Sequence, residues 1–178
     1  MIMKKTITVF GSSRPVDGEE EYIAAYKLGK LLAQNDFNVC TGGYQGIMNA
    51  VSKGAYENGA ETIGVTINGW GSVTSKYLTR EIKCDDLNDR LAKLVENGDA
   101  YVVLQGGTGT LLELSLVWEL INKKMLKAKP VVAHSKMWKE IIDIIDKQLS
   151  TENRITGLVK NFGTVEEIAD YLCERLTD

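Results

Sequence analysis

The stretch Gln105-Gly-Gly-Thr-Gly-Thr-Leu-Leu-Glu113 decides the fold class of this 178-residue chain. It follows an apolar run at 100–104 that has the length of a buried strand, and it leads into a helical pattern. A strand, a glycine turn and a helix in this order are typical of α/β proteins that bind an anion at a helix N-terminus. We expect the glycines to adopt positive φ and to let backbone amides approach the anion, with two threonine hydroxyls as further donors. The expected binding residues of this turn are Gly106, Gly107, Thr108, Gly109 and Thr110.

Two more turns of small residues follow predicted strands. A strand at 7–10 ends in a Gly-Ser-Ser turn, and a strand at 38–40 is followed by Thr-Gly-Gly-Tyr-Gln-Gly-Ile-Met at 41–48. Because the carboxyl ends of parallel strands meet at one edge of a sheet, the three turns predict a shared ligand site. A single glycine turn is often only a tight connection, so this prediction depends on all three. The two additional turns would contribute Gly11, Ser12, Ser13, Gly42, Gly43 and Gly46.

The rest of the chain strictly alternates strand-length apolar runs with helical patterns. This predicts an α/β fold, a doubly wound parallel sheet with helices on both faces, in a single domain at 1–178. Strands are expected at 7–10, 38–40, 62–67, 81–84, 100–104, 130–133 and 158–161. Helices are expected at 19–34, 46–58, 87–96, 110–124, 138–149 and 165–176. The irregular segment 68–80 leaves a strand at the ligand edge and is interpreted either as a mobile flap or as a surface loop.

Composition excludes several classes of function. The 44% hydrophobic and 25% charged residues are ordinary for a globular protein, and the net charge of −3 argues against a nucleic-acid partner. No apolar run reaches the roughly 18 residues of a membrane-spanning helix, and the start of the chain is too polar for a signal peptide. We therefore expect a cytoplasmic protein that binds neither membrane nor nucleic acid.

The cysteines and the single histidine give little support for a metal site. Cys40, Cys84 and Cys173 lie far apart without a Cys-x-x-Cys pair, so we expect reduced thiols, no disulfide and no metal. Cys40 and Cys84 each end a predicted strand, where they are either buried hydrophobic residues or part of the pocket rim. His134 also follows a strand, but the sequence offers no evident nucleophile for a triad built on it.

The three turn motifs, in this order and at these spacings, resemble those of the LOG (Lonely Guy) family, which also contains the molybdenum cofactor carrier proteins. The similarity spans nearly the whole chain, and 105–113 matches the signature Pro-Gly-Gly-x-Gly-Thr-x-x-Glu at every fixed position except Gln105. The resemblance implies a Rossmann-like, nucleotide-binding homodimer without a metal or redox cofactor. It also implies hydrolysis of the N-glycosidic bond of adenosine monophosphate or cytokinin riboside monophosphates, which releases the base and ribose 5-phosphate.

The resemblance also implies two catalytic residues, Arg90 and Glu113. The family motif Met-His-x-Arg-Lys corresponds to residues 87–91, where only Arg90 matches, so the preferred base stays open. Cleavage of a ribosyl C–N bond passes through an oxocarbenium-like sugar, which a carboxylate such as Glu113 stabilises while it orients or deprotonates water. Arg90 would hold phosphate or ribose oxygens or the departing base, because a guanidinium is a poor general acid. The alternatives are an exposed helix salt bridge for Arg90 and an early-helix dipole partner for Glu113.

Two functions of different class remain. Retention of Arg90 and Glu113 favours a phosphoribohydrolase acting on a nucleoside 5′-monophosphate, and the changed residues around Arg90 favour a non-catalytic carrier of a nucleotide or pterin-phosphate cofactor. Arg14 is either a further phosphate ligand or a solvated loop residue. The implied dimer would use the helices near 87–96 and 111–121, unless their apolar residues pack on the sheet of their own chain. Those residues are Leu91, Leu94, Val95, Leu114, Val117, Trp118 and Ile121.

Overall fold

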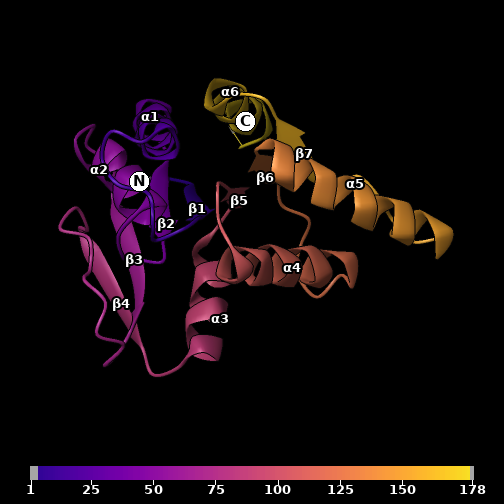
Figure 1. Ribbon diagram of the computed structural model, residues 1–178, viewed down its shortest axis with the longest axis horizontal. Helices are drawn as coiled ribbons and strands as arrows, with labels where there is room; N and C mark the ends of the chain where they lie inside the picture. Colours follow the sequence, from indigo (N-terminus) through magenta and orange to yellow (C-terminus); the bar gives the residue numbers. More distant parts are fainter. Residues whose placement is uncertain (1–3, 177–178) are drawn as a thin grey trace.

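The computed structural model describes residues 4–176, which form a seven-stranded parallel sheet between two layers of helices (Figure 1). The strands are β1 (Thr6–Phe10), β2 (Asn38–Thr41), β3 (Thr62–Ile67), β4 (Arg80–Cys84), β5 (Ala100–Val103), β6 (Val131–His134) and β7 (Val159–Phe162). They are ordered β4-β3-β2-β1-β5-β6-β7, and every neighbouring pair is parallel. The predicted parallel sheet is therefore confirmed.

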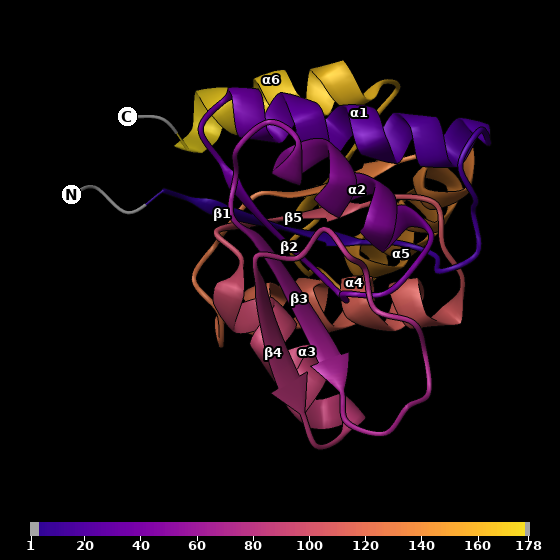
Figure 2. The same cartoon turned by 90° about the vertical axis from the view of Figure 1, so that its left-hand side faces the viewer.

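The helices of the described chain cover both faces of this sheet. They are α1 (Glu20–Gln34), α2 (Ile47–Tyr56), α3 (Leu87–Asn97), α4 (Thr108–Asn122), α5 (Lys136–Thr151) and α6 (Val165–Leu176). Helices α1, α2 and α6 pack on one face, and α3, α4 and α5 pack on the other (Figure 2). This arrangement confirms the Rossmann-like fold that the alternating pattern and the family resemblance predicted.

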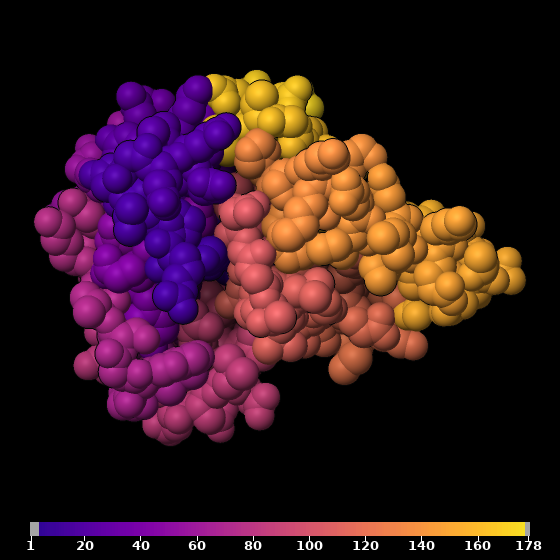
Figure 3. All heavy atoms as spheres, in the orientation of Figure 1, coloured from indigo at the N-terminus to yellow at the C-terminus, as the bar shows by residue number. Residues whose placement is uncertain are grey.

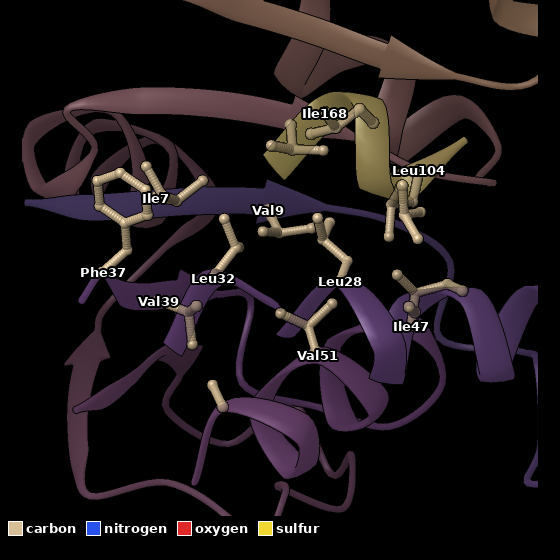
Figure 4. Close-up of a cluster of buried hydrophobic side chains, with 14 of the residues drawn as sticks. Ile7, Val9, Leu28, Leu32, Phe37, Val39, Ile47, Val51, Leu104 and Ile168 are labelled. Atoms are coloured by element: carbon tan, nitrogen blue, oxygen red, sulfur yellow. The ribbon is translucent and has the colours of Figure 1, made fainter. Parts of the chain in front are cut away.

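Alternating side chains of the buried strands contribute to two hydrophobic cores. Ile7 and Val9 of β1 face α1 and α6, where they belong to the same cluster as Leu28 and Ile168 (Figure 4). Phe10 belongs to the opposite cluster, which includes side chains of α3, α4 and α5. Burial on both faces explains why the strands read as nearly continuous apolar runs in the sequence.

The sheet has its topological switch point between β1 and β5. From β1 the chain winds outward to β4, then returns to β5 beside β1 and winds outward again to β7. The two central strands remain joined at their ends, where the amide of Leu104 donates to Phe10 O at 2.9 Å. Open α/β sheets bind ligands in the crevice outside the carboxyl ends of such strands. The fold therefore supports the predicted position of the site.

One connection departs from the expected alternation. β3 and β4 are parallel neighbours, yet the segment 68–79 that joins them contains no helix. Parallel pairing only requires the chain to return to the opposite end of the sheet, and about a dozen irregular residues can do so. The second half of the crossover is held on α2 and its preceding turn: the Ser75 amide donates to Gly43 O at 2.8 Å, and the Ser75 hydroxyl donates to Asn49 Oδ1 at 2.8 Å. The prediction of strict alternation was therefore wrong here.

The structure resolves the alternatives for two of the cysteines. Cys40 and Cys84 lie in the core beneath α3 and α4, so the buried interpretation is correct. Burial raises the pKa of the Cys40 thiol to about 12, which makes it a poor nucleophile. His134 lies on the other half of the sheet, with its Nδ1 atom 3.2 Å from Phe162 O. Within residues 4–176, no three His, Cys, Asp or Glu side chains are grouped as metal ligands, and no helix has the length and apolar character to cross a bilayer.

The apolar residues that suggested a dimer surface pack within their own chain. All seven named positions on α3 and α4 are buried, mostly against the sheet. Of the two alternatives, packing on the sheet of their own chain is therefore correct for these residues, because these helices need an apolar stripe to cover the sheet. The exposed apolar side chains of α4 are instead Leu111 and Leu112.

Candidate active site

A cavity of about 630 Å³ opens at the carboxyl edge of the sheet, at the switch point. Its walls are the turns after β1, β2 and β5, the start of α4, and the β3–β4 crossover. The lining residues are Gly11, Ser12, Ser13, Arg14, Tyr44, Gln45, Met48, Trp70, Ser72, Val73, Arg90, Gly107, Thr108, Gly109, Thr110 and Glu113. The three predicted turns thus meet, as the sequence pattern indicated.

Backbone hydrogen bonds join these turns directly. The Ser12 amide donates to Gln105 O at 2.8 Å, and the Ile47 amide donates to Ser12 O at 2.8 Å. Gly46 allows this approach, because a Cβ atom there would collide with the backbone of Ser12 and Ser13. Its φ of 69° is also a conformation that glycine adopts without strain. The β2–α2 turn is therefore packed tightly beneath the β1 turn.

Seven of the eleven predicted binding residues line the cavity, and four do not. The four are Gly42, Gly43, Gly46 and Gly106. Their hydrogens face neighbouring protein atoms, since a Cβ on Gly42 would meet the Arg90 guanidinium and one on Gly106 would meet the Thr110 side chain. A Cβ on Gly43 would likewise meet Thr66 at 2.7 Å. These glycines provide room for the protein's own packing, and their role as ligand contacts stays a prediction.

The start of α4 differs from the expected geometry but remains open to a ligand. Of the glycines in the three turns, Gly43 and Gly46 have positive φ, whereas Gly106, Gly107 and Gly109 do not, so the prediction of positive φ at these three was wrong. The helix begins at Thr108 with no side-chain cap, and its first backbone bond runs from the Leu111 amide to Gly107 O. The amides of 108–110 therefore precede the helical bonding pattern. A Cβ on Gly107 or Gly109 would meet no protein atom within 4 Å.

Arg90 and Glu113 form a buried pair at the wall of this cavity. Arg90 is only 7% exposed, and its Nε donates to Val65 O at 2.8 Å while Nη2 donates to Gly42 O at 3.2 Å. Its Nη1 lies 3.5 Å from Glu113 Oε1. Arg90 is thus not in an exposed helix salt bridge, and Glu113 lies beyond the first turn of α4, so neither alternative interpretation fits.

The environment of the pair raises the pKa of the Glu113 carboxyl. Burial raises the pKa of Glu113 to about 7, against the opposing effect of the Arg90 charge. Near neutral pH the carboxyl therefore populates both its protonated and ionised forms. Two aromatic rings flank the guanidinium, with Cζ of Arg90 5.7 Å from the Tyr44 ring centroid and 5.9 Å from that of Trp70.

Several lining residues were not among the predicted site residues. Tyr44, Gln45 and Met48 belong to the quoted motif at 41–48, where only the glycines had been assigned. Trp70, Ser72 and Val73 come from the β3–β4 crossover. Trp70 stands between two glycines in an irregular segment, and this unusual position was the only feature of the sequence that could have indicated a site residue there. Arg14 also lines the cavity, where it is exposed and where its amide donates to Ser12 Oγ at 3.1 Å.

Comparison of the sequence with curated proteins identifies several relatives named as cytokinin riboside 5′-monophosphate phosphoribohydrolases. The chain is 31% identical to a cytokinin riboside 5′-monophosphate phosphoribohydrolase of Arabidopsis thaliana, over 98% of this chain and 83% of that protein. It is 27% identical to a probable enzyme of the same name from Oryza sativa subsp. japonica, over 98% of this chain and 77% of that protein. A Rhodococcoides fascians enzyme of this name is 28% identical over 72% of this chain and 66% of its own length.

Solved structures match the fold. The molybdenum cofactor carrier protein of Chlamydomonas reinhardtii superposes with a TM-score of 0.79 at 24% identity, covering 99% of this chain and 100% of that one. The molybdenum cofactor binding protein of Rippkaea orientalis gives a TM-score of 0.80 at 22% identity, with 99% and 100% coverage. The model of the SLOG cluster4 family matches residues 4–168. The chain therefore belongs to the SLOG cluster4 family, with the LOG-type relatives that its motifs predicted.

Proposed function

We propose that this protein is a phosphoribohydrolase that cleaves the N-glycosidic bond of a nucleoside 5′-monophosphate to a free base and ribose 5-phosphate. One observation carries the proposal: the buried Arg90–Glu113 pair borders a cavity that also receives the uncapped N-terminus of α4. The arrangement combines an anion site with a carboxylate for the sugar. The names of the relatives from Arabidopsis and Rhodococcoides support the same reaction.

The 5′-phosphate would bind at the start of α4. The amides of 108–110 and the helix dipole favour a negative charge there, and the hydroxyls of Thr108 and Ser13 add donors from two sides of the cavity. Arg14 lines the same cavity and supplies a positive charge. Glu113 follows Thr108 by five positions, which corresponds to roughly 7–8 Å along a helix axis. The carboxylate is thus displaced from the phosphate site by about the length of a ribose unit.

Glu113 would act on the sugar. When the C1′–N bond breaks, its electron pair goes to the base nitrogen and the ribose becomes oxocarbenium-like, which the ionised carboxylate stabilises. Glu113 then accepts a proton from the water whose oxygen bonds to C1′, and the base nitrogen that holds the electron pair takes up a proton from solvent, so that one water is consumed for each base and ribose 5-phosphate released. Arg90 keeps its charge throughout, so its role is to orient the carboxylate and the ribose or base atoms next to it.

The proposal is tested by incubating the protein with a panel of nucleoside 5′-monophosphates and cytokinin riboside monophosphates, followed by chromatography for free base. We expect equimolar base and ribose 5-phosphate from the parent protein, and release that is slower by a factor of about 10²–10⁴ from Glu113→Gln. A protein that binds these nucleotides but releases no base would instead act as a carrier. That alternative is favoured by the changed residues around Arg90, and a pterin-phosphate cofactor is then the ligand to titrate.

We also propose that the chain forms a homodimer through α4 and α5. A groove of about 440 Å³ between these helices is lined mainly by apolar side chains, and α5 projects from the body of the molecule (Figures 1 and 3). Exposed Leu111 lies at the groove, and the buried Nε1 of Trp118 has no hydrogen-bond partner among residues 4–176. Light scattering at micromolar concentration should give twice the chain mass, and Leu111→Asp should give the monomer. A parent protein that is already monomeric would exclude the dimer.

A further inference from the structure

Trp70 is a half-exposed aromatic residue in an irregular segment, yet the structure holds it in a defined position. Its side chain is 52% exposed and lines the cavity. Gly69 and Gly71 on either side have φ of 72° and 70°, a conformation that other residues adopt only with strain. The indole also makes an edge contact with Tyr44, with ring centroids 6.0 Å apart and an interplanar angle of 71°. A tryptophan placed in this way at a cavity wall is not explained by core packing.

The cavity is lined by residues of two chemical kinds. Small and hydroxyl residues and the helix amides of 108–110 suit a phosphate. Tyr44, Met48, Trp70 and Val73 present ring and aliphatic surfaces. The Arg90 guanidinium is 3.5 Å from the Glu113 carboxylate, and its Cζ lies 5.7 Å from the Tyr44 ring centroid and 5.9 Å from that of Trp70. The two aromatic rings are therefore grouped beside the Arg90–Glu113 pair.

From this arrangement, and on the basis of the proposed phosphoribohydrolase function, we infer that Trp70 determines base specificity by stacking a bicyclic purine ring of the substrate on its indole. With a phosphate at the start of α4 and a ribose beside Glu113, the base lies next to the Arg90–Glu113 pair, where the Trp70 ring is located. Stacking tolerates any substituent pattern on the ring but increases with overlapping area. A purine therefore gains more than a pyrimidine, which gives a preference for the size of the base rather than for its edge.

The β3–β4 crossover is thereby given a function. Gln45 Nε2 donates to Val73 O at 3.3 Å and to Thr74 O at 3.0 Å, so the residues that follow Trp70 are attached to the turn that also carries Tyr44. These bonds and the ring contact between Trp70 and Tyr44 join the crossover to the β2–α2 turn.

The test is calorimetric binding in a Glu113→Gln background, which prevents turnover of the ligands. The probes are adenosine monophosphate, cytidine monophosphate and ribose 5-phosphate, which has no base. Trp70→Ala should weaken binding of adenosine monophosphate by roughly 10- to 100-fold, the range of base–aromatic stacking. Binding of cytidine monophosphate should weaken less, binding of ribose 5-phosphate should not change, and Trp70→Phe should restore part of the loss.

Tyr56→Ala is the matched control, because Tyr56 is 49% exposed and does not line the cavity, and it should leave all three affinities unchanged. Equal weakening of ribose 5-phosphate and adenosine monophosphate would reduce Trp70 to a structural role, and an unchanged affinity for adenosine monophosphate would also overturn the inference. Because binding is measured without turnover, these outcomes are separate from those of the base-release assay, which alone decides the proposed reaction.

Discussion

Two glycine turns of this protein look alike in sequence but have different structural roles. At the start of α4, Gly107 and Gly109 face open space, so the backbone is accessible from the cavity. At the β2–α2 turn, Gly43 and Gly46 have positive φ and face protein atoms, so the same residue type serves internal packing. A glycine therefore marks a close approach, but the sequence does not say whether the approaching group is a ligand or the protein itself.

The largest expected effect is on the rate of base release, when Glu113 on α4 is substituted. Glu113→Gln keeps the shape of the side chain but removes the charge that stabilises the oxocarbenium-like sugar. Base release in single-turnover experiments should fall by a factor of about 10²–10⁴, the usual range for a positioned acid–base group, while nucleotide affinity changes little. Unchanged base release would remove Glu113 from the chemistry.

A substitution in the β2–α2 turn should instead lower the stability of the folded protein. Gly46→Val places a branched side chain at a φ of 69° and against the backbone of Ser12 and Ser13. We expect a loss of unfolding free energy on the order of 3–5 kcal/mol, measured by urea denaturation. A variant with parental stability would mean that the three turns are not packed as described.

The charge of Glu113 gives the α4 region a pH dependence. Its pKa is about 7 in the folded protein and near the ordinary 4.5 when unfolded, so between these values the folded state holds an extra proton. Stability should therefore fall as pH rises from 4.5 through 7, by on the order of 3 kcal/mol, and Glu113→Gln should remove this fall. Base release should rise with pH as the carboxylate ionises and reach half its maximum near pH 7. Denaturation curves of the parent and the variant at several pH values, compared pairwise, isolate this contribution from other titrating groups.

The smallest expected effect is on stability, when the same glycine-to-valine substitution is made at the start of α4. Gly109→Val places its side chain in the cavity, where no protein atom lies within 4 Å of the new Cβ. Stability should change by no more than about 0.5 kcal/mol, since valine is slightly better than glycine within a helix. Calorimetry should show nucleotide affinity reduced by at least about tenfold, because a buried backbone donor that loses its partner costs about 1–3 kcal/mol. If Gly109→Val unfolds the protein while Gly46→Val does not, the distinction between the two turns is wrong.

Most of the secondary structure could be predicted from the sequence, because it depends on the local periodicity of apolar residues. Expected and observed elements agree within two residues at their ends, with α4 beginning at Thr108 rather than residue 110. The parallel pairing of β3 with β4 and the irregular segment between them were both expected. The hydrogen bonds that hold this segment on α2 and its preceding turn could not be predicted, because they join residues distant in the chain. The domain assignment, the homodimer and the cytoplasmic location stay predictions.

The sequence by itself determined the doubly wound sheet, the edge at which three turns meet, and the presence of Arg90 and Glu113 at positions matching the family motifs. These features follow from apolar periods, turn residues and residue identity. Only the tertiary structure decided that Arg90 is buried against Val65 and Gly42, that burial raises the Glu113 pKa, and that Trp70 joins Tyr44 at the cavity. Desolvation and close packing arise between segments distant in the chain, so no local pattern encodes them.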